Sequence, residues 1–74
     1  MNKGYFLVYT TSCAFYCENI MKPLSGMLVK LVPTPREYSS DCGIAVYFEY
    51  EDLILLEKLL QEHNLEYELK LIHT

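Results

Sequence analysis

The residues of this sequence that are best suited to chemistry are gathered between positions 33 and 43, in the segment Pro-Thr-Pro-Arg-Glu-Tyr-Ser-Ser-Asp-Cys-Gly. Cys42 provides a thiol, and an accessible thiolate is a nucleophile that exchanges with other sulfur centres. Arg36 adds a permanent positive charge. Gly43 lets the backbone turn sharply or come close to a ligand. We therefore expect any chemistry to be centred on Cys42. The alternative is that Cys42 packs as an inert residue at the start of a strand.

Two alternating apolar runs flank this segment, at residues 27–32 and 44–48, and both predict β-strands. A hairpin connection usually takes about two to five residues, so a longer one in a small domain is typical of a functional loop. Pro33 and Pro35 fix their own φ angles and favour extended conformations in the residues before them. The sequence therefore predicts a shaped loop between two paired strands.

The whole chain is expected to form one domain, residues 1–74, with the element order β-α-β-β-α-β. Further strands are predicted at residues 5–10 and 66–72. This order is typical of the ferredoxin-like α+β fold, a four-stranded antiparallel sheet with two helices on one face. In that topology the loop shares an edge of the sheet with the N-terminus of the first helix. Cys13 and Cys42 would then be neighbours beside a helix N-terminus, which lowers thiol pKa values.

Apolar stripes at helical spacing predict both helices. Thr11 or Ser12 is expected to cap the first helix, and Ser25-Gly26 to end it. Glu51 and Asp52 are expected to open the second helix, and Asn64 to end it in a left-handed conformation. The first stripe consists of Ala14, Cys17, Met21 and Leu24, and the second of Leu53, Leu56, Leu59, Leu60 and His63.

Composition limits the classes of function. The formal net charge of −4 argues against a surface that follows nucleic-acid phosphates. No apolar run approaches the roughly 20 residues of a membrane span, and the N-terminus does not resemble a signal peptide. Three cysteines do not suit a disulfide framework. We expect a reduced, cytoplasmic setting, with no membrane and no nucleic-acid partner.

Other groupings of reactive residues are weaker. Cys13 and Cys17 lie one helical turn apart and could join Cys42 as thiolate ligands, but Cys17 belongs to the core stripe and the sequence lacks a Cys-x-x-Cys motif. We therefore expect no metal and no cofactor. Arg36 and Glu37 could act as an anion clamp and an acid–base pair, or form only a local ion pair.

The loop resembles the signature of the putative Se/S carrier protein-like family, whose members carry P-x-P-R-E-x-S-x-x-C-G. Ala14 and Glu18 match the family's Ala-x-x-x-Glu spacing, whereas Tyr9-Thr10-Thr11 departs from the family's entry to this helix. The resemblance implies a carrier rather than an enzyme, one that holds selenium or sulfur as a (seleno)persulfide on Cys42 and exchanges it with donor and acceptor proteins. The implied binding residues around that thiol are Pro33, Pro35, Arg36, Glu37, Ser39, Ser40 and Gly43. No family role passes to the other two cysteines.

A second hypothesis concerns the sheet face that the helices leave uncovered. Strand alternation places Tyr47 on that face, with Tyr5 or Tyr9 beside it. Aromatic residues there stack bases in RNA-recognition modules, but the acidic charge opposes such a role here. An aromatic face more often marks a protein contact. The alternative to a carrier is therefore an interaction module that forms a homodimer or docks a partner through this face, with an incidental thiol.

Overall fold

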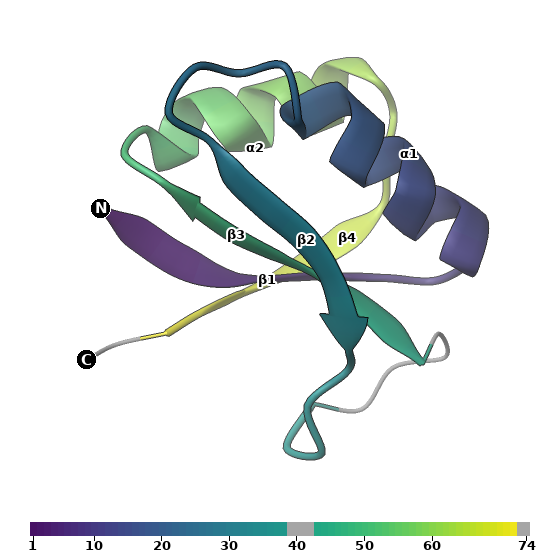
Figure 1. The fold of residues 1–74 in the computed structure, drawn as a ribbon. Helices are drawn as coiled ribbons and strands as arrows, with labels where there is room; N and C mark the ends of the chain where they lie inside the picture. The colour runs from purple at the N-terminus through teal and green to yellow at the C-terminus, as the bar shows by residue number, and fades with distance from the viewer. Residues whose placement is uncertain (39–42, 73–74) are drawn as a thin grey trace.

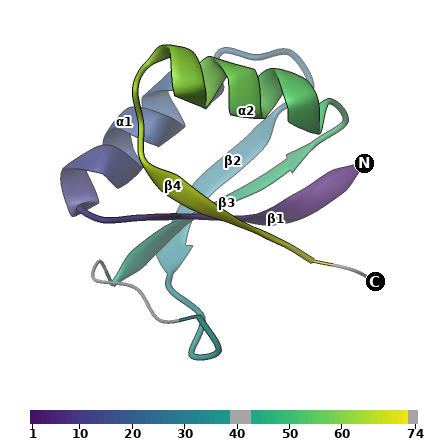
Figure 2. The ribbon, with the colours of Figure 1, turned by 180° about the vertical axis from the view of Figure 1, so that it is seen from behind.

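The computed structural model describes residues 1–38 and 43–72 of the chain. Its elements are β1 (Asn2–Val8), α1 (Thr11–Met21), β2 (Leu28–Pro33), β3 (Ile44–Tyr50), α2 (Leu53–Glu62) and β4 (Tyr67–Leu71). The four strands form one sheet in the order β2-β3-β1-β4, and each neighbouring pair is antiparallel. Both helices lie on the same face of this sheet (Figures 1 and 2). The predicted α+β fold is confirmed, and the strand order is compatible with the ferredoxin-like pattern.

The helix α1 begins one residue earlier than expected. Thr10 is its N-cap, and the Thr10 hydroxyl oxygen accepts a hydrogen bond of 3.1 Å from the backbone amide of Cys13. The prediction that Thr11 or Ser12 caps the helix is therefore wrong, because the side chain of Thr10, whose backbone is extended, already accepts from a free amide of the first turn. The prediction that Ser25-Gly26 ends this helix is also wrong, because the helix ends at Met21 with Lys22 as its C-cap. Pro23 has no amide hydrogen to continue the hydrogen bonding, so Leu24 of the predicted stripe lies beyond the helix.

The helix α2 is capped by Asp52, whose carboxylate accepts a 3.0 Å hydrogen bond from the amide of Leu55. Asn64 has a φ of 56°, which confirms the predicted left-handed stop. The prediction that His63 lies on the inner face of the helix is wrong. His63 is the exposed C-cap, and its ring lies beside the Tyr16 ring of α1, with 3.2 Å between Nδ1 and the phenol oxygen.

The ends of the strands differ from the predictions, because backbone pairing rather than residue type decides where a strand begins and ends. β1 begins at Asn2, which pairs with Tyr50 at the far end of β3. It ends at Val8, two residues before Thr10, which is the N-cap of α1. The strands predicted at 27–32, 44–48 and 66–72 are present with ends shifted by one or two residues.

The core lies between the sheet and the helices. The Phe6 and Phe48 rings stack at 4.6 Å between centroids, and both side chains are fully buried. The predicted stripe of α1 packs against them through Ala14, Cys17 and Met21. Leu56 and Leu60 of α2 complete this core, whose buried members are Phe6, Val8, Ala14, Cys17, Met21, Val46, Phe48, Tyr50, Leu56 and Leu60.

Candidate functional site

The loop that follows β2 is closed at its base by the backbone. Pro33 and Ile44 form the last pair of the β2–β3 ladder, and the amide of Thr34 donates a 3.0 Å hydrogen bond to the carbonyl oxygen of Gly43. Leu7, next to the last residue of β1, pairs with Ala45 at this same end of the sheet. The loop therefore leaves and rejoins the sheet beside the start of α1 (Figure 1), as the topology predicts.

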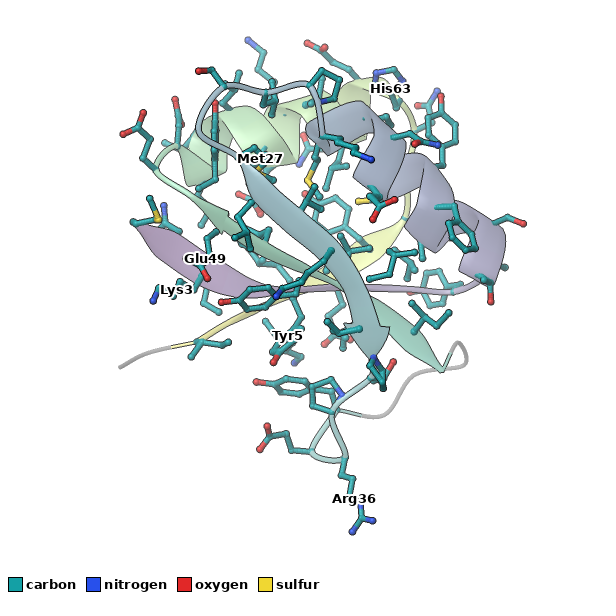
Figure 3. The ribbon with its side chains drawn as sticks, in the orientation of Figure 1. Lys3, Tyr5, Met27, Arg36, Glu49 and His63 are labelled. Atoms are coloured by element: carbon teal, nitrogen blue, oxygen red, sulfur yellow. The ribbon has the colours of Figure 1, made fainter. Side chains whose placement is uncertain are left out.

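The first half of the loop is a tight turn. The amide of Tyr38 donates a 3.0 Å hydrogen bond to the carbonyl oxygen of Pro35, so Arg36 and Glu37 occupy the two central positions. Both side chains are exposed, and Arg36 points away from the sheet (Figure 3). Within residues 1–38 and 43–72, neither side chain forms an ion pair. Arg36 thus presents its positive charge to solvent.

Tyr38 behaves differently from its neighbours in the turn. It is half-buried, and its ring meets the Tyr5 ring edge-on at 5.9 Å between centroids. The Lys70 ammonium lies over the same Tyr38 ring at 5.9 Å from its centroid. Tyr5 in turn packs against Tyr47 of β3, with 5.5 Å between ring centroids. The turn is therefore attached to the sheet by aromatic contacts.

These contacts lie on the sheet face opposite the helices, which we call the open face. Cross-strand pairing puts Tyr5 and Tyr47 on it, as predicted, together with Lys70. Tyr9, the other aromatic residue considered for this face, follows the end of β1 and is 57% exposed. Figure 3 shows Tyr5 on the side of the sheet that faces the loop.

Among the described residues, nothing at Gly43 demands a glycine. Its φ is outside the left-handed region, and a Cβ built on it would meet no described atom within 4 Å beyond its chain neighbours. The two predicted roles of Gly43, a sharp turn beside the thiol or close approach by a ligand, therefore stay predictions. No atom of the described residues blocks such an approach.

The described cysteines have unequal surroundings. Cys17 is 1% exposed, and its burial, with a smaller contribution from Cys13, raises the pKa of its thiol to about 12. Cys13 is half-buried in the first turn of α1. Cys42, Ser39 and Ser40 lie outside the described residues, so the predicted proximity of Cys13 and Cys42 stays a prediction. In the described part of the chain, no three Cys, His, Asp or Glu side chains gather as metal ligands.

Charged partners surround the aromatic contacts of the open face. The Tyr47 hydroxyl donates a 2.7 Å hydrogen bond to Glu49, and this bond is the main reason that the pKa of Tyr47 is raised to about 12. Lys70 forms an ion pair of 2.9 Å with Glu68, and the hydrogen bond to Glu68 raises the pKa of Lys70. Lys70 therefore stays charged above the Tyr38 ring at neutral pH.

Comparison with known proteins identifies the family. A protein-family model described as Putative Se/S carrier protein-like matches residues 3–69 of this chain, which include the whole loop, both helices and most of the sheet. The chain belongs to this family. No curated protein and no solved structure gives a significant match.

The range matched by the Se/S carrier-like family model includes the loop positions that the sequence analysis singled out. Among them are Pro33, Pro35, Arg36, Glu37 and Gly43. The structure adds Tyr5, Tyr38 and Lys70, which the sequence alone did not single out as partners. Tyr38 occupies a position at which the family signature allows any residue, so the signature does not single it out. Lys70 is distant in sequence from the loop, and its only signal was the strand alternation that puts it on the same face as Tyr5. Neither described helix is long and apolar enough to cross a membrane.

Proposed function

We propose that this protein carries sulfur or selenium as a persulfide or selenopersulfide on Cys42 and passes it to a partner protein. The observation that carries this proposal is the family match, whose range of residues 3–69 includes the loop from residue 33 to residue 43. A carrier of this kind needs a donor protein and an acceptor protein, and it performs no net reaction of its own. A reducing cytoplasm is the proposed setting for such a thiol, because thiols are kept reduced there.

The proposed transfer is a thiol exchange in which atoms and electrons balance. The Cys42 thiolate attacks the outer sulfur of a donor persulfide, a bond forms between the Cys42 Sγ and that sulfur, and the donor S–S bond breaks. The donor cysteine leaves as a thiolate, so no outside oxidant or reductant is needed. Selenium follows the same course when the donor is a selenopersulfide. Delivery repeats the step with an acceptor thiolate.

The described part of the loop supports this chemistry through charge and access. Arg36 is exposed at the tip of its turn without an ion pair to any described residue. An exposed guanidinium attracts an anionic donor and stabilises a persulfide anion. No atom of the described residues fills the space beside Gly43, where we propose that a second sulfur-bearing chain approaches. Ser39 and Ser40 are proposed to add hydroxyl donors.

A mass measurement tests the proposal directly. Reduced protein is incubated with glutathione persulfide or glutathione selenopersulfide, and intact and peptide masses are then recorded. We expect a gain of one sulfur or one selenium atom on Cys42, which reduction removes. The adduct should be absent from Cys42→Ser and present in Cys13→Ser and Cys17→Ala, which serve as matched controls. An adduct that never forms on Cys42 with either donor would overturn the carrier function.

The interaction module remains the second candidate, since the predicted aromatic pair on the open face is present. It predicts no adduct, and partner binding that survives Cys42→Ser but weakens when Tyr38 or Tyr47 is truncated. The predicted homodimer would use the same face. Sedimentation of the wild type and Tyr47→Ala over a range of concentrations tests it, and a monomer throughout would contradict it.

A further inference from the structure

Side-chain exposure changes at the end of the turn that Pro35 begins. Arg36 and Glu37 are exposed, whereas Tyr38, next along the chain, turns its ring onto the open face. There the ring is in contact with two groups at once, the Tyr5 ring and the Lys70 ammonium. Edge-on aromatic pairs and cations over aromatic rings are both attractive arrangements. Tyr38 is therefore bound to the sheet by two separate interactions.

Both partners of Tyr38 lie on paired strands of the sheet. Tyr5 lies in β1, which pairs with β3 on one side and β4 on the other. Its direct cross-strand neighbours are Tyr47 and Lys70. Tyr47 is held by its hydrogen bond to Glu49, and Lys70 by its ion pair with Glu68. The ring of Tyr38 thus meets side chains that have further partners of their own on the sheet.

Burial on the open face shows that this end of it is covered. Leu7 is 5% exposed and Ala45 is fully buried, although neither belongs to the core between sheet and helices. They pair with one another directly beside Tyr5 and Tyr47, at the end of the sheet from which the loop leaves. The open face is therefore covered at Leu7 and Ala45, while Tyr5 and Tyr47 beside them are half-buried.

We propose that Tyr38 is a positioning residue, which anchors the turn that precedes the Cys42 segment to the open face through Tyr5 and Lys70. The described chain on the two sides of the Cys42 segment is then fixed at two points. One is Tyr38 on the open face, and the other is Gly43, whose carbonyl oxygen accepts the hydrogen bond from Thr34. The effect on sulfur or selenium transfer rests on the proposed function, but the anchoring of the loop does not.

Native-state proteolysis tests the anchor without any sulfur chemistry. Arg36 is the exposed trypsin site of the turn, and Lys58 in α2 reports opening of the rest of the fold. Each cleavage rate is divided by that of the same variant unfolded in urea, which removes the effect of the substitution on the protease. We expect Tyr38→Ala to raise cleavage after Arg36 about tenfold, with cleavage after Lys58 unchanged.

Further variants separate the ring from the charge. Tyr38→Phe keeps the ring and should behave as wild type, while Lys70→Met should raise Arg36 cleavage less than Tyr38→Ala does, and Lys70→Arg should restore it. Phe15→Ala removes an aromatic ring that is 51% exposed on α1 and serves as the matched control. Unchanged Arg36 cleavage in Tyr38→Ala, or an equal rise after Lys58, would overturn the proposal.

Transfer to Cys42 supplies the second measurement. Tyr38→Ala should load from glutathione persulfide about ten- to a hundredfold more slowly than wild type, because misplacing a reacting group costs factors of this size. Tyr38→Phe should restore the rate. Equal loading by wild type and Tyr38→Ala would overturn the positioning role in transfer. If wild type itself gains no adduct, the carrier function fails, and the cleavage after Arg36 still decides whether Tyr38 anchors the loop.

Discussion

Thr34 and Gly43, nine positions apart in sequence, are joined by a backbone hydrogen bond of 3.0 Å between the Thr34 amide and the Gly43 carbonyl oxygen. This bond extends the β2–β3 ladder one step past its last residue pair, Pro33 and Ile44. The loop that carries the family signature therefore begins and ends at neighbouring points. Its base is part of the sheet, while the Arg36 tip projects into solvent.

The two glycines Gly4 and Gly43 should respond oppositely to substitution. A Cβ at Gly4 would collide with the carbonyl oxygen of Lys70 and lie 3.0 Å from the Leu71 Cα, both of them backbone atoms of the paired strand β4. We expect Gly4→Ala to lower the free energy of unfolding by about 1–3 kcal/mol. Gly43→Ala should change it by less than about 0.5 kcal/mol. Urea denaturation of both variants checks this, and equal losses would contradict the described geometry.

The three cysteines should differ in their rates of alkylation. Cys17 should react slowest, because it is 1% exposed and its thiol has a raised pKa. Cys42 should react fastest, because it lies in a loop with Arg36. Iodoacetamide labelling followed by peptide mass analysis measures each rate. Labelling of Cys17 ahead of Cys42 would contradict both expectations.

Ionisation of Cys17 should make stability sensitive to alkaline pH. Its pKa is raised from 9.0 to about 12 in the folded protein, so the unfolded chain loses this proton first. Stability from this group is fully present below pH 9.0 and is lost as the pH rises towards 12. Between pH 8 and 10.5 the loss should be about 2 kcal/mol larger in wild type than in Cys17→Ala. Denaturation in reductant at both pH values measures it, and parallel losses would contradict it.

The cap of α1 gives a local test of the helix start. Thr10→Ala removes the hydroxyl that accepts from the Cys13 amide and should lower the free energy of unfolding by about 1 kcal/mol. Ser12→Ala lies inside the first turn and should cost much less. Thermal or urea unfolding distinguishes the two. A larger loss in Ser12→Ala would restore the later cap that the sequence suggested.

Core and loop substitutions should separate stability from function. Leu56 is fully buried, so Leu56→Ala should cost about 2–5 kcal/mol. Arg36→Ala and Cys42→Ser should stay within about 0.5 kcal/mol of wild type, while loading of Cys42 slows in the first and stops in the second. If Cys42→Ser proved as damaging as Leu56→Ala in urea denaturation, Cys42 would be a core residue rather than a carrier thiol.

The local pattern of the sequence determined the elements and the covered face. Ala14, Cys17 and Met21 recur at helical spacing, and Val46 and Phe48 alternate with Tyr47, so each set can lie only on one side of its element. The same reasoning located the left-handed stop at Asn64 and the unusual loop after β2. The loop signature, read residue by residue, also indicated the family.

Contacts between distant parts of the chain were decided only by the tertiary structure. Whether Thr10 or Ser12 caps α1 depends on where β1 stops pairing. His63, the C-cap of α2, contacts Tyr16 of α1 because the two helices pack on the same face of the sheet (Figure 1). The anchoring of Tyr38 requires Tyr5 and Lys70, which belong to strands at opposite ends of the sequence. Period and residue type say which face of a strand a side chain takes. They do not say which loop folds over that face, because that depends on the order and register of all the strands.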